Sequence, residues 1–229
     1  MSRQEPLALR LEAAPGFDNF IPAGNEEVLA LLRGLAQKPQ PGFTSIWGPP
    51  ASGKSHLLQA LCNQASESGV QAVYLPLSQL QQSDPAELEI FAEHPLICLD
   101  ELDCLSQSRP WQEALYRLYN ALQQAGACLV SASRVPPRQL PLQLADLASR
   151  LSWGPCYQLQ PLDDPHKARL LQQRALERGL QLPDEAAQYL LNRQQRDLAS
   201  LLEILERLDQ ASLIAQRRLT LPFIREQLS

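Results

Sequence analysis

Short hydrophobic runs alternate with helix-like patterns over the first 160 residues of the chain. The runs are apolar on both faces and occupy residues 44–47, 72–75, 96–99, 128–132 and 156–159. Residues 55–66, 86–93 and 110–124 lie between them and have the spacing of helices. Buried strands that alternate with helices indicate a parallel sheet covered on both faces by crossover helices. We therefore predict an α/β fold for this part of the chain.

The pattern changes near residue 161. Residues 165–178, 184–193 and 196–216 read as successive helices without an intervening strand, and a short helix is expected at 222–228. Gly179 and Pro183 mark helix ends in this region. The sequence thus predicts an N-terminal tail (1–16), an α/β domain (17–160) and a small helical domain (161–229).

A phosphate-binding loop follows the first predicted strand. Gly48, Gly53, Lys54 and Ser55 satisfy the pattern G-x-x-x-x-G-K-[ST], and a helix-like segment comes directly after them. Loop amides and the helix N-terminus can surround a phosphate, while the lysine and serine side chains serve the phosphate oxygens and Mg²⁺. The residues expected to contact nucleotide here are Pro50, Ala51, Ser52, Gly53, Lys54, Ser55 and His56.

Two acidic residues end the third predicted strand. Asp100 and Glu101 follow the apolar run Leu96-Ile-Cys-Leu99. Ligands of parallel sheets gather at the carboxyl ends of the strands, so both side chains should face the bound nucleotide. We expect Asp100 to hold Mg²⁺ with Ser55, and Glu101 to polarise an attacking water.

Three further polar residues each allow two interpretations. Ser133, in Ser131-Ala-Ser133, either senses the γ-phosphate or belongs to an ordinary strand-end turn. Arg150 either pairs locally at a helix end, or reaches the γ-phosphate of a neighbouring subunit as an arginine finger. Arg196 either reaches back over the nucleotide or lies on a solvated face.

Composition and charge exclude several classes of protein. The net charge is −5, which argues against a general nucleic-acid surface. The five cysteines contain no C-x-x-C pair, and most lie in apolar runs, as expected for buried thiols in a reducing cytosol. No apolar run is long enough to span a membrane, and we expect neither a zinc site nor a membrane partner. The sequence predicts a cytoplasmic protein.

The residues from 17 to 228 resemble the AAA+ module of the bacterial replication initiator DnaA. The resemblance rests on the phosphate loop, the acidic pair and the opening Phe17-Asp-Asn-Phe-Ile-Pro-Ala-Gly-Asn25. It implies a five-stranded parallel sheet in the order 5-1-4-3-2 and a C-terminal helical lid, with Phe20 and Ile21 lining the base pocket. The match ends where an initiator continues into a DNA-binding domain, so DNA contact is expected to be mainly indirect.

Four segments are similar to the Hda-like branch of this family, whose members inactivate DnaA. They are Pro136-Pro-Arg-Gln-Leu140, Asp146-Leu-Ala-Ser-Arg-Leu-Ser-Trp-Gly154, Leu159-Gln-Pro-Leu162 and Ala215-Gln-Arg-Arg-Leu-Thr-Leu-Pro-Phe223. This resemblance implies that Arg150 is the arginine finger, Ser133 sensor 1 and Arg196 sensor 2. One extra residue in Ser133-Arg-Val-Pro-Pro could shift the sensor 1 assignment by one position.

The N-terminal tail fits the sliding-clamp peptide that the Hda-like family carries. Gln4, Leu7 and Leu9 offer an amide for a polar subsite and two aliphatic side chains for an apolar groove. The expected partners are therefore the sliding clamp (the β subunit of DNA polymerase III) and DnaA, with self-association into a homodimer or a higher homo-oligomer.

The resemblance implies a negative regulator of replication initiation. Such a protein would bind ADP, ATP or another nucleotide with Mg²⁺ and would stimulate hydrolysis of the ATP held by DnaA. The intact phosphate loop and the pair Asp100-Glu101 also allow an autonomous ATPase that loads or remodels a helicase. A nucleotide-dependent scaffold without hydrolysis is a third interpretation.

Overall fold

The structure is a computed structural model that describes residues 14–193 and 197–228. Nearly all of these residues form two compact units, residues 15–161 and residues 162–228. The first unit is the α/β domain, and the described residues of the second form helices with short connections and no strand.

Five parallel strands form the sheet of the α/β unit. They run in the order β2-β3-β4-β1-β5 and comprise β1 (Gly42–Trp47), β2 (Ala72–Pro76), β3 (Leu96–Asp100), β4 (Cys128–Ser133) and β5 (Cys156–Gln158). The order confirms the predicted 5-1-4-3-2 sheet. Each of the five strands lies within about two residues of the segment that the sequence predicts.

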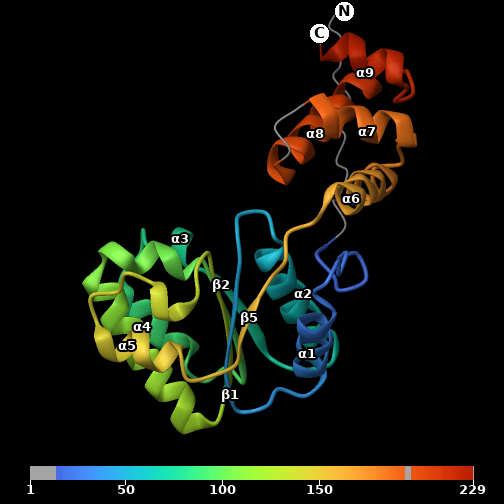
Figure 1. Cartoon of the computed structure of the whole chain (residues 1–229). Helices are drawn as coiled ribbons and strands as arrows, with labels where there is room; N and C mark the ends of the chain where they lie inside the picture. Colours follow the sequence, from blue (N-terminus) through green and yellow to red (C-terminus); the bar gives the residue numbers. More distant parts are fainter. Residues whose placement is uncertain (1–13, 194–196, 229) are drawn as a thin grey trace, which may run out of the picture. The chain divides into compact units, whose positions relative to one another are not determined.

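Helices cover both faces of this sheet (Figure 1). One face carries α1 (Glu26–Gln37) and α2 (Lys54–Glu67), and the other carries α4 (Arg109–Ala125) and α5 (Ala145–Leu151). Short elements complete the unit: α3 (Leu77–Leu80), η1 (Pro85–Phe91), η2 (Leu102–Gln107) and η3 (Pro137–Gln139).

The central strand β3 shows why its residues are apolar without interruption. Leu96 and Cys98 pack among the residues of α1 and α2, whereas Ile97 and Leu99 pack among those of α4. Successive side chains of a strand point to opposite faces, so a strand between two helical layers must be apolar at every position.

Two helical segments differ from the sequence prediction. The amphipathic helix α1 was not predicted, although it buries Val28, Leu29, Leu32, Leu35 and Ala36. The segment predicted as a helix at 86–93 is the 3₁₀ helix η1. Asp84 caps η1 by accepting a hydrogen bond from the Ala86 amide at 2.9 Å, and Leu88 is its single buried side chain. One buried residue gives little reason for a longer α-helix to form.

The helical unit contains α6 (Asp164–Glu177), α7 (Asp184–Arg193), α8 (Leu198–Ala215) and α9 (Leu221–Gln227). These bounds confirm the predicted helices to within two residues. Asp163, Asp197 and Thr220 accept hydrogen bonds from amides of the first turns and so fix three of the starts. No helix in the described part of the chain is both long and apolar enough to cross a membrane.

Candidate functional site

The phosphate loop joins β1 to α2, and the Lys54 side chain is hydrogen-bonded to residues of the loop itself. The Lys54 ammonium donates hydrogen bonds to the carbonyls of Gly48 and Pro49, both at 2.8 Å, and to the Ser52 hydroxyl at 3.3 Å. Burial lowers the pKa of Lys54, while the nearby Asp100 and Asp103 oppose this shift. An anion within the loop would offer this lysine a charged acceptor in place of two neutral carbonyls.

The predicted base pocket lies beside this loop. The Phe20 ring packs against Gly53 so closely that a Cβ atom on the glycine would stand 2.6 Å from Phe20 Cε2. Phe20 also faces the His56 ring at a centroid distance of 5.7 Å, and His56 Nε2 is hydrogen-bonded to the Gly16 carbonyl at 2.9 Å. Ile21, the next residue in the chain, is buried. The structure thus brings the predicted base-pocket residues to the predicted phosphate loop.

Asn25 fastens this region to the end of the sheet, a role that the sequence analysis did not assign. Its buried amide donates to the carbonyls of Pro22 at 2.8 Å and Gln160 at 3.1 Å, and it accepts from the Gln160 amide at 2.7 Å. The side chain therefore ties the segment before α1 to the chain that leaves β5. An asparagine immediately before a helix is a common cap, so its type and position do not indicate this contact over 135 residues.

Asp100 lies at the carboxyl end of β3, as predicted, and is almost fully buried. Its carboxylate accepts hydrogen bonds from the Tyr74 hydroxyl and from the Glu101 amide, both at 2.8 Å. Burial raises the pKa of Tyr74 to about 12, and the Tyr74 hydroxyl also interacts with Ser55. Tyr74, which was not predicted, therefore contacts Asp100 and lies near Ser55, the two residues expected to hold Mg²⁺.

Glu101 has a strained backbone, and its side chain is hydrogen-bonded to a neighbouring residue. Its φ angle is +62°, in the left-handed region that few non-glycine residues occupy. Its carboxylate accepts a hydrogen bond from the hydroxyl of Ser78, which lies in α3 just after β2. The structure thus connects the carboxylate expected to polarise water with a serine that the sequence analysis did not consider.

Ser133 ends β4 beside the phosphate loop. Its carbonyl accepts a hydrogen bond from the Gly48 amide at 3.2 Å, and its hydroxyl donates to the Val135 carbonyl at 2.7 Å. The next amide, that of Arg134, donates to both carboxylate oxygens of Asp103 at 3.0 and 2.8 Å. The position of Ser133 beside the phosphate loop suits a γ-phosphate sensor. Its hydroxyl, however, makes the hydrogen bond of a strand-end turn, so the structure is compatible with both interpretations.

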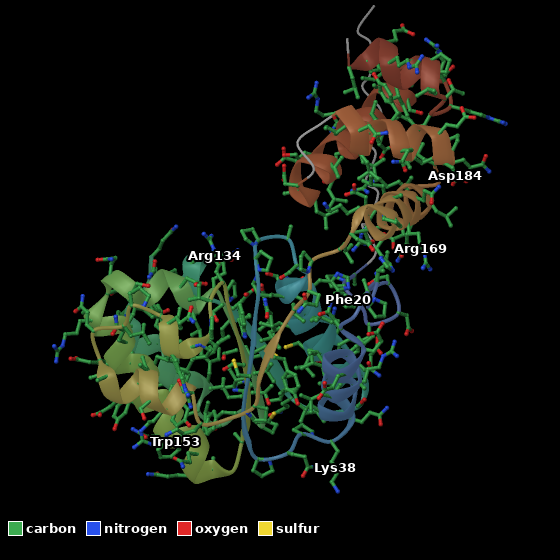
Figure 2. The ribbon with its side chains drawn as sticks, viewed as in Figure 1. Phe20, Lys38, Arg134, Trp153, Arg169 and Asp184 are labelled. Carbon is green, nitrogen blue, oxygen red and sulfur yellow. The ribbon has the colours of Figure 1, made fainter. Side chains whose placement is uncertain are left out.

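Arg150 lies in the last turn of α5, at the other end of the sheet. The Arg150 carbonyl accepts a hydrogen bond from the Tyr119 hydroxyl at 3.0 Å, and the Tyr119 ring stacks on Phe43 at 3.9 Å. Phe43 stands near the start of β1, whereas the phosphate loop begins after Trp47, roughly 13 Å along the strand at its usual rise per residue. In Figure 2, Trp153 marks this end of the sheet and Arg134 marks the other.

The Arg150 guanidinium is surrounded by aromatic rings. It lies 5.1, 5.7 and 5.6 Å from the ring centres of Tyr116, Tyr119 and Trp153, and its Nη1 donates to Gln123 at 3.1 Å. None of the ion pairs found within residues 14–193 and 197–228 includes Arg150. The geometry therefore leaves the cation unneutralised by any described carboxylate.

Four of the predicted residues lie outside the described part of the chain. They are the clamp-binding residues Gln4, Leu7 and Leu9 and the sensor 2 residue Arg196.

The described residues fit a magnesium nucleotide better than a metal bound by protein alone. Within the described ranges, no cluster of three or more His, Cys, Asp or Glu side chains could hold a metal ion. Mg²⁺ usually takes one or two protein oxygens and completes its shell with phosphates and waters. Ser55 and Asp100, both near Tyr74, supply such a pair.

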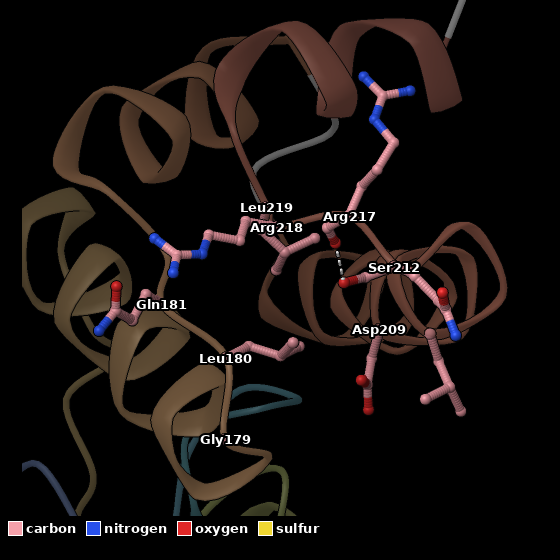
Figure 3. Close-up of a pocket in the computed structure, with 10 residues that line it drawn as sticks. Gly179, Leu180, Gln181, Asp209, Ser212, Arg217, Arg218 and Leu219 are labelled. Atoms are coloured by element: carbon pink, nitrogen blue, oxygen red, sulfur yellow. Dashed lines mark hydrogen bonds between the residues drawn. The ribbon is translucent and has the colours of Figure 1, made fainter.

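The helical unit carries a cavity of about 490 Å³ (Figure 3). It is lined by the turn after α6 and by the end of α8 with the following turn, where the Ser212 hydroxyl donates to the Arg217 carbonyl. None of the residues predicted to bind nucleotide lines this cavity.

Two family profiles match the chain in succession. The profile of the bacterial DnaA ATPase domain matches residues 11–158. The profile described as Hda, lid domain, matches residues 164–228.

Solved structures share this fold at low sequence identity. Domain III of the DnaA replication initiation protein from Thermotoga maritima is 22% identical with a TM-score of 0.81, over 93% of this chain and 95% of that one. A replication initiator DnaA bound to AMPPCP and single-stranded DNA is 21% identical with a TM-score of 0.73, over 85% of this chain. This chain covers 64% of the length of that initiator.

A structure of the RuvB Holliday junction branch migration motor from Thermotoga maritima is also similar. It is 17% identical with a TM-score of 0.70, over 96% of this chain and 72% of that one. Likenesses at this level of identity establish the fold and leave the function to the site.

Proposed function

Because this chain belongs to the family of the bacterial DnaA ATPase domain and continues into an Hda lid domain, we propose that it regulates DnaA negatively. In this role it stimulates hydrolysis of the ATP held by DnaA, and Arg150 supplies the arginine finger. The hydrolysis converts the initiator to its ADP form and so prevents renewed initiation.

The position of Arg150 is the observation that supports this function most. The residue belongs to the end of the α/β unit where β1 begins, while the chain's own phosphate loop follows the other end of β1. A guanidinium in that position suits a nucleotide held by a neighbouring molecule better than its own. An added cation at a γ-phosphate stabilises the charge of the transition state and can raise the rate by about 10³–10⁵-fold.

The chain's own nucleotide has a structural role in this proposal. ADP or ATP would be held by the phosphate loop, by Phe20 and Ile21 at the base, and by Ser55 and Asp100 through Mg²⁺. Bound nucleotide would supply a negative charge to Lys54, whose ammonium otherwise donates to two loop carbonyls. Ser133 and Arg196 complete the proposed pocket as sensors.

The sliding clamp is the proposed second partner. Gln4, Leu7 and Leu9 would dock in an apolar groove of the clamp and bring the regulator to DNA-loaded complexes. A short peptide that must become ordered on binding has modest affinity, on the order of micromolar, and a dimer or higher oligomer would gain avidity on a ring-shaped clamp. We expect the protein to act in the cytoplasm.

The direct test measures the loss of DnaA-bound ATP. Adding the wild-type chain with the clamp loaded on DNA should accelerate this loss, and no acceleration would contradict the proposal. Replacing Gln4, Leu7 and Leu9 together by Ala should abolish retention on immobilised clamp, with Leu11→Ala as the matched control in the same tail. Equal retention of both variants would contradict the proposal that these three residues bind the clamp.

A second candidate function is an autonomous ATPase that loads or remodels a helicase. The intact phosphate loop and the acidic pair Asp100-Glu101 at the carboxyl end of β3 favour it, because both are parts of a site able to hydrolyse nucleotide in cis. This candidate predicts substantial turnover by the purified chain and its loss on Glu101→Gln. The regulator predicts little turnover without DnaA.

A further inference from the structure

Trp153 is an exposed tryptophan directly after the helix that carries Arg150. About 65% of its surface is accessible, although large aromatic side chains are normally mostly buried. Its ring centre lies 5.6 Å from the guanidinium carbon of Arg150, and its amide donates a hydrogen bond to the Arg150 carbonyl at 3.1 Å. The two residues therefore contact each other through both backbone and side chain.

The backbone beneath Trp153 is fixed by a close approach. A Cβ atom at Gly154 would lie 1.6 Å from the Phe43 carbonyl oxygen, so only glycine fits at this position. Phe43 in turn stacks on Tyr119, which is fully buried. The point at which the Trp153 side chain leaves the backbone is thus determined by contacts to β1 and α4.

The side-chain partners of Arg150 among the described residues are three aromatic rings and one amide, all of them uncharged. Trp153, Tyr116 and Tyr119 offer ring faces, and the exposed Gln123 accepts one hydrogen bond at 3.1 Å. Ring faces attract a cation without neutralising it, and an amide fixes its orientation without forming an ion pair. Such surroundings restrict a long flexible side chain while keeping its charge available to an outside anion.

We propose that Trp153 and Gln123 are positioning residues that hold the Arg150 guanidinium in the direction from which it enters a neighbour's phosphate site. This inference rests on the proposed function and deepens it. Tyr119 anchors the backbone of the finger, while Trp153 and Gln123 limit the conformations of its side chain. Without them the arginine must be ordered during each encounter, which lowers the rate within the complex rather than the affinity for the partner.

The test compares variants by their stimulation of ATP loss from DnaA over a range of concentrations. Trp153→Leu keeps an apolar side chain but removes the ring, and it should lower the saturating rate about tenfold with an unchanged half-saturating concentration. Trp153→Phe restores a ring face and should recover the rate to within about threefold of wild type. Leu176→Ala, which removes an equally exposed apolar side chain from α6, is the control and should match wild type.

Gln123→Glu provides the second variant. A carboxylate at this position would pair with the guanidinium now 3.1 Å from the Gln123 oxygen, and the saturating rate should fall as it does for Trp153→Leu. Thermal unfolding and nucleotide affinity should be unchanged, which separates positioning from misfolding. If Trp153→Leu does not fold, Gln123→Glu alone tests whether the neighbours of Arg150 position its guanidinium.

Two results would overturn the inference. One is a wild-type saturating rate for both Trp153→Leu and Gln123→Glu. The other is a raised half-saturating concentration for Trp153→Leu at an unchanged saturating rate, which would make Trp153 a contact for the partner. In both cases the wild-type chain still stimulates hydrolysis, whereas failure of the proposed function would show as no stimulation by any variant.

Discussion

The Phe20 ring occupies the space in which a side chain on Gly53 would begin. An ideal Cβ on Gly53 would stand 2.6 Å from Phe20 Cε2, and the glycine has a φ angle of +90°. One glycine thus serves two predicted functions, because it allows the backbone to turn around a phosphate and leaves room for the ring at the base pocket.

Gly53→Ala should therefore impair nucleotide binding more than folding. The methyl group must displace Phe20 and also strain the loop, so we expect affinity for ADP and ATP to fall by about tenfold or more. Titration with a fluorescent nucleotide measures this loss. Gly69→Ala is the matched control, because its φ angle is +79° but open space surrounds its Cβ position. It should reduce stability by about 1 kcal/mol and leave affinity unchanged; equal affinities for both variants and wild type would count against the pocket.

Tyr74→Phe should weaken the site around Asp100 and change how stability depends on pH. Loss of the hydrogen bond to Asp100 should reduce the free energy of unfolding by about 0.5–1 kcal/mol near neutral pH. All three tryptophans lie in the α/β unit, so their fluorescence reports on its unfolding.

The pH effect follows from the direction of the Tyr74 shift. Burial raises the pKa of Tyr74 from 10.0 to about 12, so the folded state keeps a proton that the unfolded state loses. The stability contributed by the neutral hydroxyl is complete below pH 10 and is lost as the pH rises towards 12. Wild type should lose more stability than Tyr74→Phe in this interval, and parallel pH curves would contradict the assignment.

Ser78→Ala should change the chain's own ATP turnover. The Ser78 hydroxyl donates to the Glu101 carboxylate, and its removal frees this carboxylate to contact water. If Glu101 can act in cis, basal turnover should rise by about threefold to tenfold. Ser83→Ala, at an exposed serine after α3, is the control. Unchanged turnover in Ser78→Ala would show that this hydrogen bond does not restrain Glu101.

Asn25→Ala should destabilise the α/β unit. The substitution removes three partly buried hydrogen bonds to Pro22 and Gln160 and leaves the Gln160 amide without its partner, at a cost of about 2 kcal/mol. Asn63→Ala, which loses one exposed hydrogen bond to the Pro15 carbonyl, should cost less than about 1 kcal/mol. Denaturant unfolding followed by tryptophan fluorescence compares the two, and equal stabilities would contradict the role given to Asn25.

Much of the fold could be predicted because burial requires a regular pattern. The run Leu96-Ile-Cys-Leu99 is apolar at every position since helices cover both faces of β3, and this pattern also locates Asp100 at the strand's carboxyl end. The strand order came from the resemblance to DnaA, because no local pattern specifies which strands are neighbours. Helix α1 was not predicted, although its buried residues Val28, Leu29, Leu32, Leu35 and Ala36 have the spacing of one helical face.

Residues that act through long-range contacts could not be predicted in the same way. Tyr74 lies in β2 and Ser78 follows this strand, so their contacts with Asp100 and Glu101 depend on the pairing of β2 with β3. Trp153 and Gln123 lie far apart in the sequence, and each of them contacts Arg150. The phosphate loop, in contrast, is contiguous in the chain, so its chemistry could be read directly.

The central claim is that Arg150 acts on ATP held by another molecule, and one measurement tests it most directly. DnaA carrying labelled ATP is mixed with clamp-loaded DNA and with either the wild-type chain or Arg150→Ala, at concentrations that saturate the wild-type effect. The wild-type chain should accelerate loss of the label, and Arg150→Ala should reduce this acceleration by about 10³-fold or abolish it. The variant should still bind nucleotide and clamp. Full stimulation by Arg150→Ala would contradict the claim.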